Sequence, residues 1–352
     1  MGKIAVKKGH ENVSMLGIGA YRPERIVSND EICEVLDSSD EWIYERSGIR
    51  NRRWVSGDET ALSISIAAAG RAIENSGIPK EKIGALVLAT GSWTTKIPHG
   101  APQVASGLGL NGRPAFDIES GCGGFGYALA VATDMIRAGS VEYALVIGTE
   151  TLSLVLNPTD RGTAFIFGDG SGAVVIGPSE ENGISPTVWG SDGDNAGAIS
   201  QNMEIPAYMT HAQEMQHKDP AVEPLGRMFV QMEGQRVFRW AAITLPKALS
   251  SAIDQSGVSK DDIEVFIPHQ ANARINELMK ANLGLGEHVP VANDIEHTGN
   301  TSAASIPLAI EEMLVSGKAK GGQTALLLAF GAGLSYAGQV VTLPPAPKIT
   351  SF

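Results

Sequence analysis

Cys122 is the residue of this sequence best suited to covalent chemistry. It lies in FDIESGCGGFGYALAVATDMIRAG, where Ala115–Ile118 predicts the end of a strand and the residues after Cys122 predict a buried helix to about Arg137. The start of a helix offers unpaired amides and a positive dipole end, which favour a thiolate. A lone cysteine is more often an inert thiol, as we interpret Cys33. The glycines around Cys122 leave room above its sulfur, so we predict a nucleophile.

Two further polar residues lie where chemistry is common in α/β proteins. His269 ends the apolar strand predicted in DIEVFIPHQ. Asn300, in NDIEHTGNTSAAS, lies at a predicted helix start and by itself would be an ordinary N-cap. Residues 331–333, Gly-Ala-Gly, can present backbone N–H groups to an oxyanion, with a plain β-turn as the alternative. No helix follows this loop or the glycines of residues 168–177, so no dinucleotide site is expected.

An internal repeat relates these residues. Residues 71–89 (RAIENSGIPKEKIGALVLA) align with residues 251–269 (SAIDQSGVSKDDIEVFIPH) at an offset of 251 − 71 = 180. Residues 121–139 align with residues 299–317 at an offset of 299 − 121 = 178, so Asn300 takes the place of Cys122. Chance similarity between two common strand–helix units is the alternative. A duplication would bring Cys122, Asn300 and His269 to a shared midline. We therefore predict an α/β fold with largely parallel, helix-covered sheets, divided into halves 1–178 and 179–352.

Composition excludes several classes of protein. The chain has 352 residues, 43% of them hydrophobic, which is enough for a large core. A net charge of −12 disfavours binding to nucleic acid. Two distant cysteines indicate neither a disulfide framework nor a metal cluster. The N-terminal residues do not resemble a signal peptide. No apolar run approaches the roughly 20 residues that span a membrane. We expect a cytoplasmic protein.

Several independent motifs occur in order along the chain. They are SSDEWIYERSGIR (38–50), the cysteine segment, PTDRGTAFIFGDGSGA (158–173), IPHQANARI (267–275), HTGNTSAAS (297–305) and the glycine loop. On these motifs the sequence resembles, over nearly its whole length, the β-ketoacyl-acyl carrier protein synthase III family. The family implies a five-layered αβαβα thiolase-like fold and usually a homodimer. It implies decarboxylative condensation of an acyl-CoA primer with malonyl-acyl carrier protein, which yields a 3-ketoacyl-carrier protein, coenzyme A and CO2 and initiates fatty-acid synthesis. No cofactor is implied, because coenzyme A thioesters are substrates.

The resemblance also implies a role for individual residues. Cys122, His269 and Asn300 would form the catalytic triad, and the N–H groups of Cys122 and Ala332 the oxyanion hole, although many relatives have glycine at the latter position. Trp42 and Arg161 would sandwich the adenine of coenzyme A, Arg46 and Arg274 would meet its phosphates, and Asn272 its pantetheine arm. The carrier protein would dock on Arg239, Gln270, Arg274 and Lys280. Taken singly, each arginine could be a solvated side chain and Trp42 a helix-packing residue.

The primer is expected to be a medium or long acyl chain. Ile97 matches the position where relatives set pocket depth across the dimer interface, and it is smaller than the phenylalanine of many short-primer enzymes. NDIEHTGNTSAASIPLA and GAGLSYAGQVV also resemble the long-acyl branch. The segment 195–232 is rich in methionine, which adapts to flexible apolar ligands, but it could equally be a surface loop. Its methionines are Met203, Met209, Met215, Met228 and Met232.

Other functions remain open on the sequence alone. A degradative thiolase would need a second catalytic cysteine in the C-terminal half, and this sequence has none there. A polyketide starter-unit ketosynthase or an acyltransferase with the same triad is harder to distinguish. The alternative that is not an enzyme is an acyl-binding or redox-sensing thiol protein.

Overall fold

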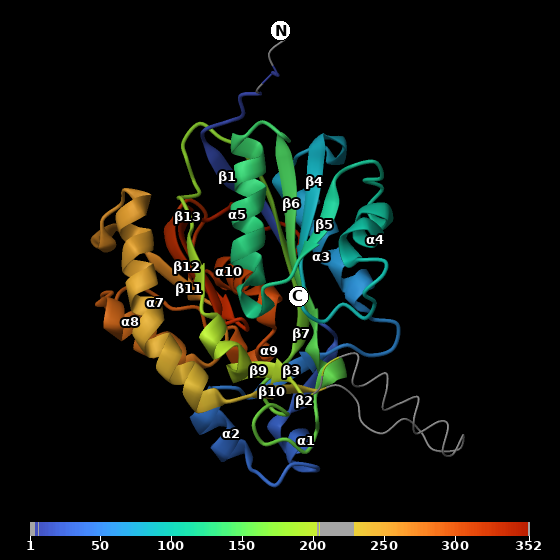
Figure 1. Ribbon diagram of the computed structural model, residues 1–352, viewed down its shortest axis with the longest axis vertical. Helices are drawn as coiled ribbons and strands as arrows, with labels where there is room; N and C mark the ends of the chain where they lie inside the picture. Colours follow the sequence, from blue (N-terminus) through green and yellow to red (C-terminus); the bar gives the residue numbers. More distant parts are fainter. Residues whose placement is uncertain (1–3, 6, 203, 205–228, 351–352) are drawn as a thin grey trace.

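Two β-sheets form the frame of the molecule (Figure 1). The computed structural model describes residues 4–5, 7–202, 204 and 229–350. The first sheet has the strand order β1-β7-β6-β4-β5 and the second the order β11-β12-β13-β8. The strands of the first sheet are β1 (Val13–Tyr21), β4 (Ile83–Ala89), β5 (Ala115–Ile118), β6 (Tyr143–Thr151) and β7 (Asp169–Pro178); those of the second are β8 (Val188–Ser191), β11 (Val265–Pro268), β12 (Thr324–Gly331) and β13 (Ser335–Thr342).

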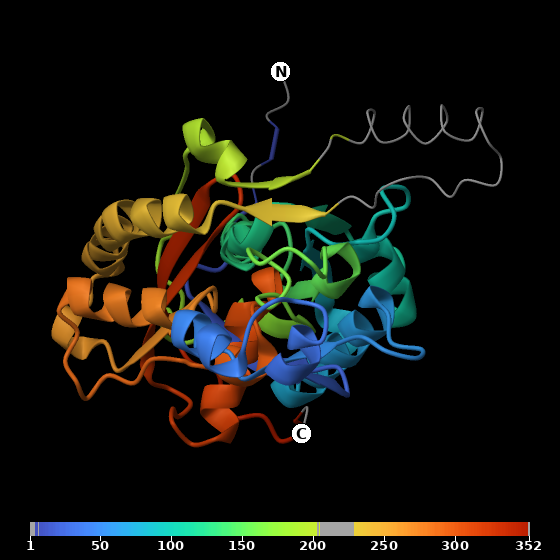
Figure 2. The same cartoon turned by 90° about the horizontal axis from the view of Figure 1, so that it is seen from below.

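Helices cover both sheets and fill the space between them. The outer face of the first sheet carries α3 (Ala61–Ser76) and α4 (Gly100–Gly107). The second sheet is covered on the opposite side of the molecule by α7 (Gly234–Ser256), against which α8 (Ala273–Leu283) packs (Figure 2). Between the sheets lie α5 (Gly124–Arg137) and α10 (Ser305–Val315), whose apolar side chains form one core with both sheets. The result is the expected succession of five layers, αβαβα.

The two sheets repeat one another. In the second sheet β8, β13, β12 and β11 follow the order of β1, β7, β6 and β4 in the first. A single parallel bridge between Phe266 and Val291 stands where β5 flanks β4. The helix before β4 corresponds to α7 before β11, and α5 corresponds to α10. This repetition agrees with the two offsets in the sequence.

The sheets are mixed, so the expectation of largely parallel sheets is wrong. β4 pairs in parallel with β5 and β6, and β11 with β12, but the other pairings are antiparallel. β12 and β13 are joined by a short glycine loop, and a connection this short can join only antiparallel neighbours. The spacing of apolar segments in a sequence does not reveal whether two neighbouring strands run parallel or antiparallel.

Smaller elements surround one end of the sheets. They comprise β2 (Arg25–Ser28), β3 (Asn51–Trp54), α1 (Asn29–Cys33), α2 (Asp40–Ser47) and α9 (Ile295–Thr298), with the antiparallel pair of β9 (Ile199–Gln201) and β10 (Val230–Met232). The described residues also include short 3-10 turns: η1 (Lys80–Lys82), η2 (Gly121–Gly123), η3 (Leu152–Val155), η4 (Gly193–Ala198), η5 (Lys260–Asp262) and η6 (Ser302–Ala304). Of the five methionines in the segment 195–232, only Met232 is described; Met203, Met209, Met215 and Met228 lie outside the described residues.

Within the described part of the chain, no helix has the length and apolar character needed to cross a membrane.

Candidate active site

One cavity of about 1270 Å³ contains all three residues predicted to act together. Cys122, His269 and Asn300 line it, together with the glycine loop at Gly331 and Ala332. The cysteine comes from η2 in the first half of the chain, and the other two come from the second half. η2 packs against η6, the turn that follows Asn300. The structure therefore brings together residues that are up to 178 positions apart in the sequence.

Cys122 lies between β5 and α5, as the sequence predicted. Its residue is only 9% exposed, and burial raises the pKa of the thiol to about 12. Hydrogen bonds to the sulfur from the Ser302 hydroxyl and from the N–H groups of Cys122 and Ala332 act in the opposite direction, but their effect is smaller. The resting nucleophile is thus a neutral thiol, whereas the helix start had favoured a thiolate.

The glycine loop is shaped to approach this sulfur closely. A Cβ atom at Gly331 would lie 2.6 Å from the Cβ atom of Cys122, a distance that real side chains do not tolerate. A Cβ atom at Gly121, which has φ +50°, would lie 2.9 Å from that of Ala332. The absence of side chains at these two positions lets the loop pack against Cys122, and the N–H groups of Cys122 and Ala332 both lower the pKa of its thiol by hydrogen bonding. Two backbone donors at one sulfur are what an oxyanion hole requires.

His269 is oriented by a hydroxyl group. Its ring is 1% exposed, its Nδ1 atom lies 2.6 Å from Ser305 Oγ, and the backbone N–H of Gln270 donates to the same oxygen at 3.3 Å. A hydroxyl that accepts from Gln270 still has its own proton to donate, and Nδ1 is the acceptor beside it, so we assign the imidazole proton to Nε2. Burial lowers the pKa of His269 to about 3, so the ring is a neutral donor. Phe330 packs edge-on against it, with ring centroids 5.1 Å apart.

Asn300 is held on both its backbone and its side chain. Its N–H donates to Ile166 O at 2.8 Å, and its carbonyl accepts from Gly168 N at 3.0 Å. The side-chain Oδ1 atom accepts from Ser302 N at 2.8 Å. With Oδ1 engaged in this way, the Nδ2 amide is the end of the side chain that can donate to a ligand in the cavity.

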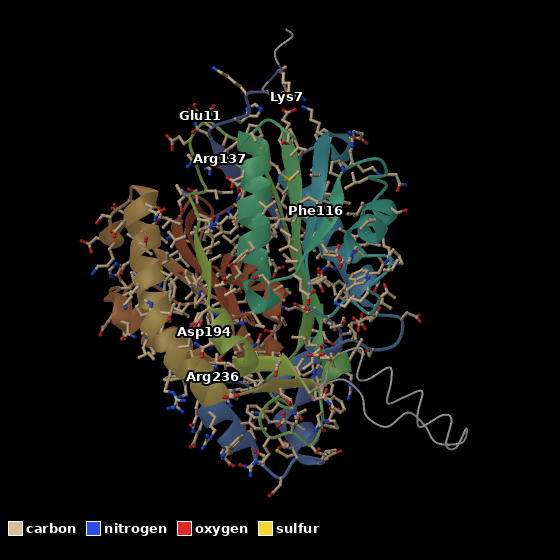
Figure 3. All side chains as sticks on the ribbon, viewed as in Figure 1. Lys7, Glu11, Phe116, Arg137, Asp194 and Arg236 are labelled. Atoms are coloured by element: carbon tan, nitrogen blue, oxygen red, sulfur yellow. The ribbon has the colours of Figure 1, made fainter. Side chains whose placement is uncertain are left out.

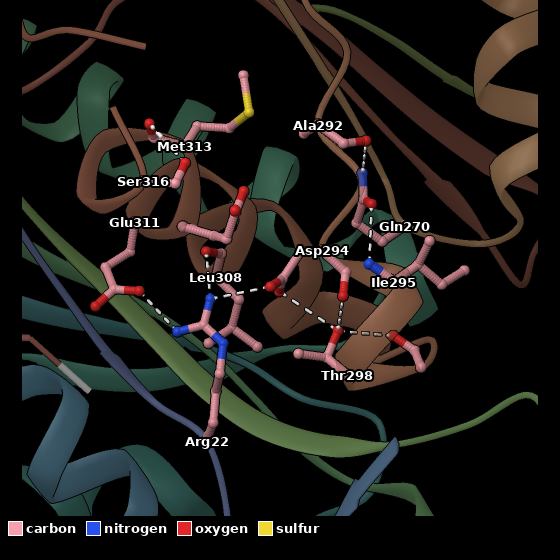
Figure 4. Close-up of polar contacts among 12 residues, drawn as sticks. Arg22, Gln270, Ala292, Asp294, Ile295, Thr298, Leu308, Glu311, Met313 and Ser316 are labelled. Atoms are coloured by element: carbon pink, nitrogen blue, oxygen red, sulfur yellow. Dashed lines mark hydrogen bonds and ion pairs between the residues drawn. The ribbon is translucent and has the colours of Figure 1, made fainter. Parts of the chain in front are cut away.

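A buried ion-pair network fixes the segment that leads to Asn300 (Figure 4). Arg22, from the end of β1, binds Asp294 Oδ1 at 3.1 Å and Glu311 Oε2 at 2.7 Å. Asp294 begins α9, and its carbonyl accepts from Thr298 Oγ1 at 2.8 Å. The first half of the chain thereby anchors the loop of the second half that carries Asn300. Breaking one member of such a pair is strongly destabilising, because it leaves a charge buried without its partner.

Gln270 belongs to the same internal framework, so the prediction that it contacts a carrier protein is wrong. Its side chain is fully buried; Nε2 donates to Pro268 O at 2.8 Å and Ala292 O at 3.1 Å, and Oε1 accepts from Ile295 N at 3.3 Å. It joins the strand that ends at His269 to the helix before Asn300 (Figure 4). Sequence spacing alone does not show whether the side chain of a glutamine at this position faces solvent or the interior.

Aromatic and basic side chains gather at the mouth of the cavity. Arg46 and Arg161 lie over the Trp42 ring, with guanidinium-to-centroid distances of 4.7 and 4.8 Å. Asn272 caps α8 by accepting from Arg274 N at 2.9 Å and donates to Arg46 O at 2.9 Å, which ties α2 to α8. Arg274 lines the same mouth and is exposed. The structure therefore groups the five residues predicted to bind coenzyme A.

The remaining predicted residues lie on the surface. Arg239, near the start of α7, is exposed and lines the cavity; Figure 3 shows the neighbouring Arg236 beside Asp194, whose carbonyl it binds at 3.0 Å. Lys280 is half-buried on α8 and donates to Glu287 O at 3.4 Å. Ile97 is 89% exposed and does not line the cavity of its own chain.

The cavity also contains a buried carboxyl group that was not among the residues predicted from the sequence. Glu150, at the end of β6, is 0% exposed and accepts from Gly91 N at 3.2 Å and Ala303 N at 3.4 Å. Burial raises the pKa of Glu150 to about 7. The sequence does contain a signal for Glu150, because the polar residues TET directly follow the apolar run YALVIG. His269 was predicted from the same kind of position at the end of an apolar strand. Ser302 and Ser305, which orient the triad, had no comparable signal.

Comparisons with known proteins agree with this arrangement. Residues 116–193 match the family model "3-Oxoacyl-[acyl-carrier-protein (ACP)] synthase III", and residues 253–343 match the model of its C-terminal part. The chain is 51% identical to the β-ketoacyl-[acyl-carrier-protein] synthase III of Mycobacteroides abscessus over 348 residues, covering 99% of each protein. It is also 51% identical to synthase III 1 of Streptomyces avermitilis, covering 98% of this chain and all of that one.

Solved structures show the same relationship. The priming β-ketosynthase of the R1128 polyketide biosynthetic pathway superimposes with a TM-score of 0.89 at 39% identity, over 98% of this chain and 100% of that one. The 3-oxoacyl-[acyl-carrier-protein] synthase III of Aquifex aeolicus gives 0.83 at 31% identity, over 94% and 100%. The chain therefore belongs to the β-ketoacyl-acyl carrier protein synthase III family: it is an acyltransferase of the condensing type, which joins an acyl-CoA primer to malonyl-acyl carrier protein at the start of fatty-acid synthesis.

Proposed function

We propose that Cys122 carries the primer as a thioester and that His269 and Asn300 promote the decarboxylation of the malonyl group. The observation that supports this most strongly is the convergence of the three side chains on one cavity, with the two donors oriented by separate hydrogen bonds. The cysteine sulfur attacks the primer carbonyl, coenzyme A leaves, and malonyl-carrier protein then takes its place. A chain with these residues needs no cofactor for either step.

The oxyanion hole serves the first half of the reaction. The N–H groups of Cys122 and Ala332 lower the pKa of the thiol by hydrogen bonding, and the same two groups can bind the oxygen of the tetrahedral intermediate. Only backbone atoms are used, so alanine at position 332 is as suitable as glycine. A donor of this kind is typically worth about 2.7–4 kcal/mol in the transition state.

His269 and Asn300 serve the second half. Loss of CO2 from the malonyl group leaves an enolate whose oxygen needs donors, and the Nε2–H of His269 and the Nδ2–H of Asn300 can supply them. The enolate carbon then attacks the acyl group on Cys122 to form the 3-ketoacyl product. The test is to incubate the protein with a radiolabelled acyl-CoA and malonyl-carrier protein: a two-carbon-longer product and CO2 are expected. Acylation without chain extension would refute the assignment.

The mouth of the cavity is proposed to bind coenzyme A. Trp42 offers a face for the adenine, and Arg46 and Arg274 offer positive charge for the phosphates. Arg161 lies on the Trp42 ring here, so an adenine between them requires the Arg161 side chain to move outward. Trp42→Ala is expected to raise KM for an acyl-CoA but not for the same acyl group on pantetheine, which lacks the base. Equal effects on both substrates would contradict this role.

We propose that the primer is a medium or long acyl chain and that two copies of the protein share the pocket. The cavity volume exceeds the roughly 300–1000 Å³ of ordinary ligand pockets. Ile97 is exposed in one chain, and β5, the edge strand next to β4, is only half-buried; both features suit contact with a second copy. A primer series from acetyl to palmitoyl, with the molecular mass measured by light scattering, tests both points. Preference for acetyl-CoA in a monomer would refute them.

A polyketide starter-unit ketosynthase is the second candidate, because the structure that superimposes with a TM-score of 0.89 is a priming ketosynthase of a polyketide pathway. Such an enzyme would accept the carrier protein of that pathway in preference to the fatty-acid carrier protein. Comparing kcat/KM for the two carriers distinguishes the candidates. A reducing compartment such as the cytoplasm suits either enzyme, since both Cys33 and Cys122 are free thiols and one is the nucleophile.

A further inference from the structure

Glu150 is a buried carboxyl group that the proposed mechanism does not yet use. It lines the cavity from the end of β6, which packs against the turn η6. Both of its oxygens lie 3.2 Å from Gly91 N, Oε1 accepts from Ala303 N, and Oε2 accepts from the Ser92 hydroxyl. These bonds fix the carboxyl group and connect the exit of β4 to the segment that follows Asn300.

Ser302 connects this carboxyl group to the nucleophile. Ser302 lines the same cavity as both groups and directly precedes Ala303, whose N–H binds Glu150. Hydrogen bonding from its hydroxyl lowers the pKa of both the Cys122 thiol and the Glu150 carboxyl group. Ser302 has φ +48°, and among the described residues it is the only non-glycine residue with a positive φ. Its backbone N–H is held by Asn300 Oδ1 at 2.8 Å. The positive φ and this bond fix the backbone that carries the hydroxyl.

The thiol must lose a proton when it is acylated, and His269 is poorly placed to accept it. Its Nδ1 atom is engaged by Ser305 Oγ, and its Nε2 atom carries a proton, so neither nitrogen has a free lone pair. The other charged side chains that line the cavity belong to its exposed rim, such as Lys96 and Glu119, which are 69% and 65% exposed and pair with each other at 3.7 Å. Glu150 is the buried acceptor that remains among the described residues lining the cavity.

We propose that Glu150 accepts the thiol proton through the Ser302 hydroxyl during acylation of Cys122 and returns it to the departing coenzyme A. As the sulfur–carbon bond forms, the sulfur–hydrogen bond breaks and its proton passes to Ser302 Oγ, while the proton of that hydroxyl passes to Glu150. When the bond to the coenzyme A sulfur breaks, the same hydroxyl delivers a proton to that sulfur and Glu150 becomes a carboxylate again. The inference rests on the proposed function only in taking Cys122 as the acylated residue.

The acid–base character of Glu150 suits this task. A proton acceptor works best when its pKa lies close to the working pH, and burial places the pKa of Glu150 at about 7. The carboxyl group is protonated below that value and cannot accept, and it is ionised above it. The acylation rate should therefore rise with pH through about 7 and then level off.

Five variants test the proposal by rapid-mixing measurement of coenzyme A release, from about pH 5 to pH 9. We expect Glu150→Gln to slow acylation by about 10²–10⁴-fold, the usual contribution of a general base, and to lose the rise near pH 7. Glu150→Asp should retain the rise. Ser302→Ala should also slow acylation, and adding Glu150→Gln to it should have little further effect. Asp169→Asn is the matched control: Asp169 is buried, accepts from Ser153 and backbone N–H groups and has a pKa raised to about 6, but it does not line the cavity.

The outcomes separate this inference from the proposed function. If Glu150→Gln keeps both the wild-type rate and the wild-type pH profile, the proton relay is refuted while Cys122 can still be the acylated residue. If neither the wild type nor any variant forms an acyl-enzyme, the proposed function is refuted instead. Should Glu150→Gln not fold, an unchanged rate and pH profile in Ser302→Ala would refute the relay by itself. Decarboxylation by enzyme acylated beforehand should be largely preserved in Glu150→Gln.

Discussion

Ser305→Ala tests whether a single hydroxyl group decides which nitrogen of His269 carries the proton. The hydroxyl lies 2.6 Å from Nδ1, and its removal leaves a buried nitrogen without that partner, which costs about 1–3 kcal/mol. The imidazole can reduce this cost by moving its proton to Nδ1. Nε2 then presents a lone pair to the cavity, and the donor to the enolate oxygen is lost. Full loss of such a donor costs about 2.7–4 kcal/mol, or about 10²–10³-fold in rate. A mixture of the two tautomers predicts a fall of about 10–100-fold, equivalent to about 1.4–2.7 kcal/mol.

The assay separates the two half-reactions of the variant. Release of labelled CO2 from malonyl-carrier protein by acylated enzyme measures decarboxylation, and the burst of coenzyme A measures acylation. We expect decarboxylation to fall while acylation stays within about twofold, because the Ser302 side of the site is unchanged. Ser316→Ala, at the end of the same helix, controls for the loss of a serine hydroxyl; its Oγ donates only to Met313 O at 3.4 Å. Equal losses in both half-reactions, or a loss in neither, would show that the hydroxyl does not set the tautomer.

Other substitutions test the rest of the site. Cys122→Ala should abolish acylation and condensation together, as measured by mass spectrometry of the acyl-enzyme. Asn300→Ala should still self-acylate but release CO2 about 10²–10³-fold more slowly, and full condensation by this variant would remove Asn300 from the mechanism. Arg274→Glu should raise KM for the carrier protein steeply at low salt and less at high salt, and an unchanged KM at low salt would exclude this docking surface. Gly331→Ala should block acylation even if the protein folds, because its Cβ atom would lie 2.6 Å from that of Cys122; a normal burst would show that the loop can move away.

The parts of the fold that the sequence predicted are those with strong local patterns. The strand–turn–helix unit around Cys122 is confirmed by β5 (Ala115–Ile118) and α5 (Gly124–Arg137), and His269 follows β11 as predicted. The offset of 178 residues between the two halves identified Asn300, which had no signal of its own beyond that of an N-cap. In a duplicated fold, equivalent residues of the two halves occupy equivalent places in three dimensions. The similarity between the halves therefore indicated where Asn300 lies, which its local helix propensity did not.

The predictions that failed depended on burial and on partners from distant segments. A thiolate at Cys122 would require the helix start to lower the pKa of the thiol more than burial raises it. Burial is the larger effect, so the pKa is raised. Gln270 lies between a surface helix and a buried strand end, and only the contacts with Ala292 and Ile295 show that it faces inward. Glu150 becomes chemically interesting only once Ser302 is placed beside it. None of these relations is encoded in the spacing of neighbouring residues.

A neutral His269 has a consequence for decarboxylation itself. The malonyl group enters the cavity as a carboxylate, and a positively charged imidazolium would bind that carboxylate and stabilise the substrate as well as the enolate. An enzyme gains rate only from interactions that are stronger in the transition state than in the ground state. Burial keeps the pKa of His269 near 3, so the ring offers the enolate a donor without holding the carboxylate back. The rate of decarboxylation by the acylated enzyme should therefore show no change between about pH 5 and pH 9 that arises from titration of His269. A change in this rate near pH 6.5, the ordinary pKa of histidine, would mean that the ring takes up a proton in the cavity.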